Sequence, residues 1–256
     1  MGNARVKEAR KLSRRSARAE RRLFLADGPK AVEAALGAPG CLVEVFATAG
    51  ATEQYAALRT AEVPWTLVEE RALASLSDSV NPAGVVAVCR FLDRPLEHVL
   101  DADKRLVAVC ADVRDPGNAG TVIRCADAAG ADAVVFAGHS VDAYNPKTVR
   151  ASVGSLFHLP VAVAPDPAAA VLAAQAAGLT VLAADGAGEV DLEHAGDLLM
   201  RPTAWLFGNE AWGLPEALAA LADHRVRVPI HGRAESLNLS TAAALCLYAS
   251  AREQRR

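Results

Sequence analysis

Three polar clusters in the second half of the chain carry the side chains that could do chemistry. They span residues 112–124, 206–215 and 228–240, and each begins where an apolar run ends. A glycine-rich turn between a strand and a helix is typical of nucleotide binding, and Gly208 would let a ligand approach the backbone closely. The GxGxxG fingerprint of dinucleotide enzymes is missing, which argues against a nicotinamide-dependent oxidoreductase.

Each cluster also has an ordinary structural explanation. Arg124 could be a solvated side chain that pairs with Asp127 one helical turn on. The second cluster could be a strand–turn–helix corner that exposes Trp212. The third could be a helix N-terminus, capped by one of three polar side chains: Ser236, Asn238 or Ser240. A cap explains one of these three residues and leaves the other two unexplained.

The elements that must position these clusters alternate between apolar strands and helices. We expect strands at 106–111, 133–137, 159–164, 180–184, 204–207 and 225–230. We expect helices near 119–129, 146–154, 167–177, 215–222 and 236–253. This alternation predicts an α/β fold with a parallel sheet covered on both faces. Because ligands bind beyond the carboxyl ends of such strands, the three clusters should lie at one edge of the sheet.

The first ninety residues predict a smaller α/β unit. A basic helix over 5–26 leads into a helix at 29–36, with Pro29 in its first turn. Strands are expected at 42–47, 65–68 and 85–91, with helices at 52–61 and 69–76. The charged segment 93–104 contains Pro95 and reads as a linker. The predicted domains are therefore 1–92 and 105–256.

Charge is unevenly distributed along the chain. The net charge of the whole chain is −3. Residues 1–22 carry seven Arg and two Lys against two Glu, a net charge of +7, so the remaining residues carry a net charge of −10. A cationic arm on an acidic body suggests a polyanionic partner, although a solvated basic helix explains it equally well. The candidates for RNA contact are Arg10, Arg14, Arg15, Arg18, Arg21 and Arg22, with Arg114 beside the first cluster.

The cysteine pattern and the hydropathy argue against a metal-binding, a disulfide-bonded and a membrane-spanning protein. The five cysteines show no CxxC spacing, so neither a zinc site nor a disulfide framework is expected, and no metal is predicted. No apolar run reaches transmembrane length, and no apolar segment follows the basic start. We therefore expect a soluble, cytoplasmic protein.

Taken together and in order, the three clusters resemble the motifs of the SpoU (TrmH-type) RNA 2′-O-methyltransferases. The matching residues are Asn118-x-Gly120-x-x-x-Arg124, Gly208-Asn209-Glu210-x-x-Gly213-Leu214 and Ser236-Leu237-Asn238-Leu239-Ser240. The resemblance covers residues 105–255, and the first ninety residues resemble the family's RNA-binding domain. The nearest subgroup includes the thiostrepton- and nosiheptide-resistance rRNA methyltransferases.

This resemblance implies a ribose 2′-O-methyltransferase that uses S-adenosylmethionine and acts on structured RNA, with 23S rRNA favoured. It also implies a homodimer, with the last helix and the second motif at the interface. A C-terminal trefoil knot would form the cofactor pocket. A tRNA substrate, or a non-catalytic RNA- or ribosome-binding relative of the same fold, are the alternatives.

The resemblance also implies roles for single residues. Arg124 is often proposed as the base in this family, but the pKa of arginine is too high for that role. We expect Arg124 to bind the adjacent phosphate and orient the hydroxyl, Asn118 to hold the loop, and Glu210 to orient the site. Ser236 and Asn238 would hydrogen-bond the cofactor or its loop. The other expected cofactor contacts are Gly208, Val228, Ile230, Leu237, Ala184 and Asp185.

Overall fold

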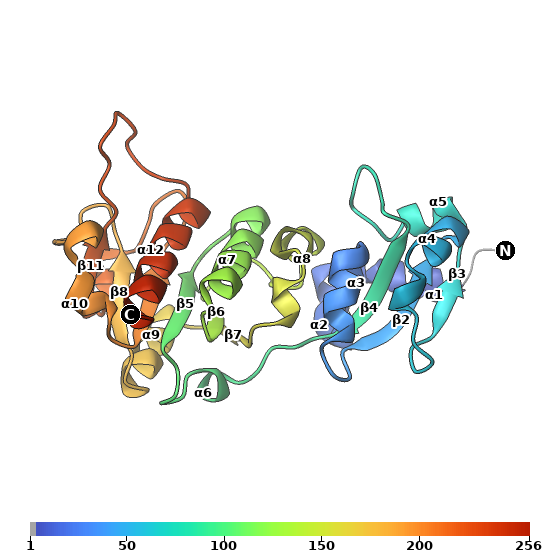
Figure 1. Ribbon diagram of the computed structural model, residues 1–256, viewed down its shortest axis with the longest axis horizontal. Coiled ribbons are helices and arrows are strands. Elements are labelled where there is room, and N and C mark those ends of the chain that lie inside the picture. The colour runs from blue at the N-terminus through green and yellow to red at the C-terminus, as the bar shows by residue number, and fades with distance from the viewer. Residues whose placement is uncertain (1–3) are drawn as a thin grey trace. The chain divides into compact units, whose positions relative to one another are not determined.

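The computed structural model describes residues 4–256, so the first three residues of the expected domain 1–92 lie outside the described part. The chain forms two compact units (Figure 1). The N-terminal unit contains residues up to 92 together with 142–158, and the C-terminal unit contains 93–141 and 159–256. The sequence alone assigns 142–158 to the C-terminal domain, whereas its contacts place it in the N-terminal unit.

The N-terminal unit is a four-stranded mixed sheet with short helices. Its strands are β1 (Leu23–Asp27), β2 (Leu42–Ala47), β3 (Trp65–Leu67) and β4 (Val85–Arg90). Its helices are α1 (Ala4–Arg10), α2 (Arg15–Arg21), α3 (Pro29–Leu36), α4 (Ala49–Gln54), α5 (Glu70–Ala74) and α8 (Pro146–Ser152). The strand order is β1-β4-β2-β3. β4 is antiparallel to β1 and β2, and β2 is parallel to β3.

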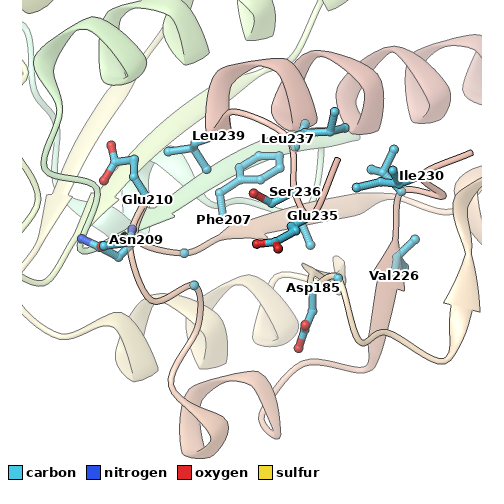
Figure 2. A pocket seen from close by; sticks show the side chains of 17 residues that line it. Asp185, Phe207, Asn209, Glu210, Val226, Ile230, Glu235, Ser236, Leu237 and Leu239 are labelled. Carbon is cyan, nitrogen blue, oxygen red and sulfur yellow. Dashed lines mark hydrogen bonds between the residues drawn. The ribbon is translucent and has the colours of Figure 1, made fainter. Parts of the chain in front are cut away.

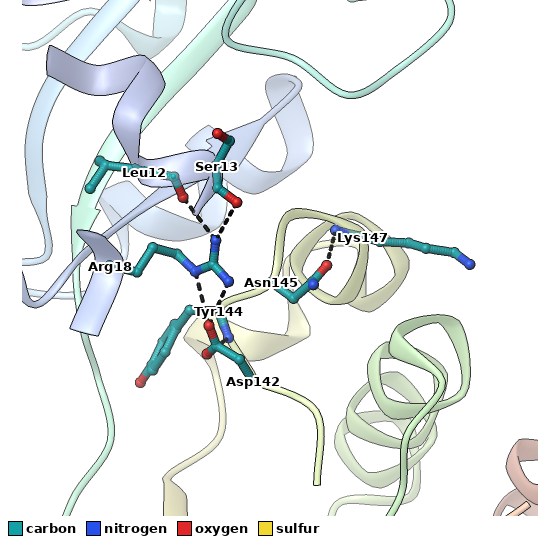
Figure 3. A network of polar contacts seen from close by, with 7 residues as sticks. All are labelled: Leu12, Ser13, Arg18, Asp142, Tyr144, Asn145 and Lys147. Carbon is teal, nitrogen blue, oxygen red and sulfur yellow. Dashed lines mark hydrogen bonds and ion pairs between the residues drawn. The ribbon is translucent and has the colours of Figure 1, made fainter. Parts of the chain in front are cut away.

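The basic N-terminal segment is not one helix, because it breaks at the 3-10 turn Lys11–Ser13. Arg18 stabilises this turn, because its guanidinium donates to the carbonyl oxygens of Leu12 and Ser13, both at 2.9 Å, and pairs with Asp142 at 2.7 Å (Figure 3). Arg18 is only 2% exposed. The expectation that Arg18 contacts RNA is therefore wrong, since its charge is used inside the unit.

The segment 142–158 is anchored by an aromatic cluster as well as by this ion pair. The ring of Tyr144 stacks on Phe91 with centroids 3.9 Å apart and lies 4.8 Å from Phe24. Its hydroxyl accepts a hydrogen bond from the backbone N–H of Leu92 at 2.8 Å. These contacts explain why the segment packs with the N-terminal unit.

The C-terminal unit is built on a seven-stranded sheet whose pairings are parallel throughout. The strands are β5 (Leu106–Ala111), β6 (Ala133–Ala137), β7 (Val161–Ala164), β8 (Thr180–Ala184), β9 (Val190–Asp191), β10 (Thr203–Phe207) and β11 (His224–Arg227). Their order is β7-β6-β5-β10-β8-β11-β9. The predicted parallel α/β sheet is confirmed. The knot, which rests on the family resemblance, stays a prediction.

Helices cover both faces of this sheet. They are α6 (Leu96–Val99), α7 (Pro116–Ala129), α9 (Pro167–Ala176), α10 (Gly196–Leu199), α11 (Glu216–Ala219) and α12 (Leu239–Gln254). On β10, Leu206 packs into the core cluster that contains α9. Its neighbour Trp205 donates to Ser250 of α12 at 2.9 Å. Because neighbouring strand residues point to opposite faces, α9 and α12 lie on opposite sides.

The expected linker 93–104 is part of this unit. It contains α6, and Val99 and Leu100 are buried in the core. Among the helices formed by residues 4–256, we find none with the length and apolar character that crossing a membrane requires.

Candidate active site at the carboxyl ends of the parallel strands

From β5 the chain adds β6 and β7 towards one edge of the sheet, and it then crosses to the strands on the other side of β5. β5 and β10 are therefore neighbours at the point where the strand order reverses, and this brings the first two clusters together. Cys110 near the end of β5 is paired with Phe207 at the end of β10, so the loops after both strands leave the sheet side by side. The side-chain nitrogen of Asn209 donates to the carbonyl oxygen of Asp112 at 2.7 Å. Such a switch point is where parallel α/β sheets bind ligands.

Glu210 ties the second cluster to the beginning of α7. Its carboxylate accepts hydrogen bonds from the backbone N–H groups of Arg114 at 3.1 Å and Asp115 at 3.0 Å. It also accepts one from the side-chain nitrogen of Asn118 at 3.2 Å. A carboxylate is favoured there because the unpaired N–H groups at a helix N-terminus carry partial positive charge. The predicted residues Glu210 and Asn118 are thus in direct contact.

The third cluster joins through Asn238. Its side-chain nitrogen donates to the side-chain oxygen of Asn118 at 3.0 Å. Its own side-chain oxygen caps α12 by accepting from the backbone N–H of Ser240 at 2.9 Å. A hydrogen-bonded chain therefore runs from Glu210 through Asn118 to Asn238 and links all three clusters.

The second loop is so tight that it requires glycine. The backbones of Asn209 and Gly213 exchange two hydrogen bonds of 2.9 Å each. A Cβ added at Gly208 would lie 2.4 Å from the carbonyl carbon of Gly213, which no side chain can tolerate. Gly213 has φ +70°, in the left-handed region that favours glycine.

A pocket of about 300 Å³ opens beside the hydrogen-bonded chain of Glu210, Asn118 and Asn238 (Figure 2). Seven of the residues expected to contact a cofactor line it: Ala184, Asp185, Gly208, Val228, Ile230, Ser236 and Leu237. Asn238 is not among its lining residues and acts from beside it. Sequence reasoning missed Glu235, whose carboxylate also lines the pocket. Its place directly before the third motif was the available signal.

Arg124 and Cys110 complete the description of the site. Arg124 is exposed on α7, and within residues 4–256 no hydrogen bond or ion pair holds its guanidinium. Burial, with a smaller contribution from Glu210, raises the pKa of the Cys110 thiol to about 12. Cys110 is therefore a neutral core residue and not a nucleophile.

The remaining basic candidates lie on the surface. Arg10, Arg14, Arg15, Arg21, Arg22 and Arg114 are all exposed. Arg21 pairs with Glu8 at 2.6 Å. A hollow of about 500 Å³ in the N-terminal unit is lined by Arg10 and Arg14 together with Lys7, Lys11, Ser13 and Ser75. The sequence did not indicate the two lysines and the two serines, because only the fold brings the break between α1 and α2 next to Ser75 at the end of α5.

Residues 105–248 match the SpoU rRNA Methylase family, and residues 3–87 match the MRM3-like substrate binding domain. The chain is 34% identical to the 23S rRNA (guanosine(2553)-2′-O)-methyltransferase of Bacillus subtilis, over 96% of this chain and 95% of that one. It is 38% identical to the 23S rRNA (uridine(2479)-2′-O)-methyltransferase of Streptomyces viridochromogenes, over 68% of this chain and 61% of that one.

Among solved structures, an AdoMet-bound rRNA methyltransferase from Sinorhizobium meliloti superposes with a TM-score of 0.86 at 35% identity. The match covers 98% of this chain and 95% of that one. The family match spans more than half of the chain and contains all three clusters that the hydrogen bonds join. The chain belongs to the SpoU rRNA methylase family.

Proposed function

We propose that the protein transfers the methyl group of S-adenosylmethionine to the 2′-hydroxyl of a ribose in 23S rRNA. The observation that carries this proposal is the chain Glu210–Asn118–Asn238, which joins the three motifs beside one pocket. The relatives named above act on different nucleotides, a guanosine and a uridine, so the target of this protein must be mapped directly. Action on ribosomal RNA would place the protein in the cytoplasm.

The pocket fits the cofactor in size and chemistry. Its volume of about 300 Å³ falls at the lower end of the range for small-molecule sites, roughly 300–1,000 Å³. Val228, Ile230 and Leu237 supply apolar surface for a flat adenine, while Asp185 and Glu235 supply acceptors for ribose hydroxyls and an ammonium group. The bound cofactor supplies an electrophilic methyl group on a sulfonium.

The residues around the pocket act mainly by positioning. Arg124 is free to bind the phosphate next to the target ribose and to orient the 2′-hydroxyl. Asn118 is held from both sides, by Glu210 and by Asn238, and fixes the start of α7. Ser236 lines the pocket and orients the cofactor. Transfer leaves S-adenosylhomocysteine in the pocket and releases the hydroxyl proton to water at the open edge of the site. Alignment of the two reactants can lower the barrier by about 7–11 kcal/mol, which makes positioning the main contribution of these residues.

The N-terminal unit would hold the RNA backbone. Lys7, Arg10 and Arg14 line its basic hollow. Three cations there can each neutralise a phosphate, which makes affinity steeply salt-dependent. The exposed Arg15 and Arg22 extend this surface, whereas the charge of Arg21 is already paired with Glu8. This assignment agrees with the match of residues 3–87 to a substrate binding domain.

We propose that a second copy of the chain covers the outer face of α12. Leu245 is 45% and Tyr248 52% exposed there. They line an apolar groove of about 740 Å³ together with Leu192, Pro229 and Ala244. An apolar groove of this kind marks an interaction site. Leu245→Glu would place a charge in the groove and should yield monomers in sedimentation equilibrium.

The decisive experiment supplies the purified protein with methyl-labelled cofactor and unmethylated 23S rRNA made by transcription. A 2′-O-methyl group blocks attack of that oxygen on the neighbouring phosphate, so the modified linkage resists alkaline hydrolysis and can be mapped. A tRNA transcript forms the second arm. Label in tRNA alone would overturn the rRNA assignment. Binding of 23S rRNA without transfer to either RNA would favour a non-catalytic relative.

A further inference from the structure

The second loop of the site presents an aromatic side chain to solvent. Trp212 is 59% exposed, whereas Trp205, the third residue of strand β10, is fully buried. Both chain neighbours of Trp212, Ala211 and Gly213, line the cofactor-sized pocket. Core packing therefore does not account for this tryptophan, which stands at the edge of the site.

The loop holds Trp212 firmly. The paired backbone hydrogen bonds between Asn209 and Gly213 close the loop on either side of it. Glu210, two residues before Trp212, is bound at the same time to the side chain of Asn118 at 3.2 Å. The backbone on both sides of Trp212 is thus fixed to the hydrogen-bonded chain of Glu210, Asn118 and Asn238.

Arg114 extends the flat surface of the indole. Its guanidinium carbon lies 6.0 Å from the centroid of the Trp212 ring, within the outer range of a cation–π contact. The backbone N–H of Arg114 donates to Glu210 at 3.1 Å, so the residue is fixed to the same loop. Both side chains are exposed. Together they form a surface that is planar, aromatic and cationic.

We propose that Trp212 and Arg114 form a platform on which the base of the target nucleotide stacks. Proteins recognise specific RNA sites mostly in single-stranded loops and bulges, where unstacked bases are splayed out and stack on aromatic side chains or on guanidinium planes. An exposed indole covers a face of such a base without regard to base identity, and a neighbouring guanidinium binds the phosphate. This inference rests on the proposed function and adds the group that holds the base while Arg124 holds the backbone.

The test compares Trp212→Leu, which keeps apolar bulk without a ring, with Trp212→Phe, which keeps a ring. Unmethylated 23S rRNA is the probe for both binding and methyl transfer. Trp212→Leu should weaken RNA binding and lower kcat/KM for RNA by about 5- to 150-fold, the range expected for loss of one stacked base. Trp212→Phe should restore most of this loss. Cofactor affinity should not change in either variant. Arg114→Gln should flatten the salt dependence of binding by about one phosphate contact.

Fluorescence provides a readout that does not depend on turnover. The chain has three tryptophans, and Trp65 can be removed by Trp65→Phe, which leaves Trp205 and Trp212. Stacking of a base should quench the emission of Trp212 when RNA is added, and Trp65→Phe/Trp212→Phe should lose this quenching. If quenching occurs in a wild-type protein that transfers no methyl group, the platform stands and the proposed reaction fails.

Two outcomes would overturn the platform. One is a Trp212→Leu variant that binds and methylates RNA as the wild type does. The other is a loss of activity that coincides with dissociation into monomers, with Leu245→Glu as the reference for a disrupted dimer. In that case Trp212 contacts a second copy of the chain and not a base.

Discussion

Asn118 and Asn238 lie 120 residues apart in the chain, yet their side chains are joined by a hydrogen bond of 3.0 Å. Asn238 is also the cap of α12. One amide therefore fixes the start of the last helix with its oxygen and the first motif with its nitrogen. The two functions can be separated by substitution.

Asn238→Ala removes both the cap and the link, whereas Asn238→Asp keeps a capping oxygen and loses the donor to Asn118. We expect the alanine variant to lose about 0.5–2 kcal/mol of unfolding free energy. The aspartate variant should keep its stability but lose methyl transfer. Urea denaturation and turnover with 23S rRNA measure the two effects. An aspartate variant of full activity would show that the link is not needed.

Arg124→Ala should lower kcat by about 100-fold or more, the cost of a misaligned reactant. Cofactor affinity, measured by calorimetry, should stay unchanged because Arg124 is not among the residues that line the pocket. Arg124→Lys keeps the charge but cannot orient a phosphate and a hydroxyl with one planar group, so it should recover little. Turnover at the wild-type rate in the alanine variant would remove Arg124 from the mechanism.

The sequence predicts local features best. The helix predicted at 29–36 coincides with α3, because Pro29 at its first turn is a local signal. Strand β9 has only two residues, too few to show any period, and was missed. Seven residues that the family resemblance implies as cofactor contacts line one pocket, because the motifs that carry the resemblance are short and local.

Partners distant in the chain could not be predicted in the same way. Arg18 was assigned to the surface by its residue type, but Asp142, 124 residues further on, neutralises it in the interior. Burial of an arginine depends on such a partner, and no spacing rule connects the two positions. The strand order that puts β10 beside β5 is equally non-local, and it alone brings Asn209 to Asp112.

Arg18→Ala should destabilise the protein strongly. It leaves Asp142, only 14% exposed, without its cation, and removes the donors to Leu12 and Ser13. Breaking a buried pair in this way costs about 3–5 kcal/mol. The exposed Arg15 is the matched control, and Arg15→Ala should change the unfolding free energy by less than about 0.5 kcal/mol. Equal stability of the two variants in urea would contradict the buried role of Arg18.

Asp27 should make stability depend on pH. Burial raises the pKa of its carboxyl above the usual 3.8, and a hydrogen bond from the Ser77 hydroxyl opposes this only in part. Between 3.8 and the raised pKa the folded state therefore binds more protons than the unfolded state. The unfolding free energy then falls as pH rises through this window and stays lower above it. Asp27→Asn should raise Tm at neutral pH, and the gain should disappear in acid.

The basic hollow of the N-terminal unit can be tested without disturbing the core. Deleting residues 1–22 would also remove the buried Leu12 and Arg18, so substitution is the sharper change. Replacing Lys7, Arg10 and Arg14 together by Gln should weaken binding to 23S rRNA and reduce the slope of log affinity against log salt by about 2–3, since roughly 0.7–0.9 is lost per phosphate contact. Arg21→Gln is the control, because Arg21 is already paired with Glu8. A triple variant with the wild-type salt slope would mean that this hollow does not touch the RNA backbone.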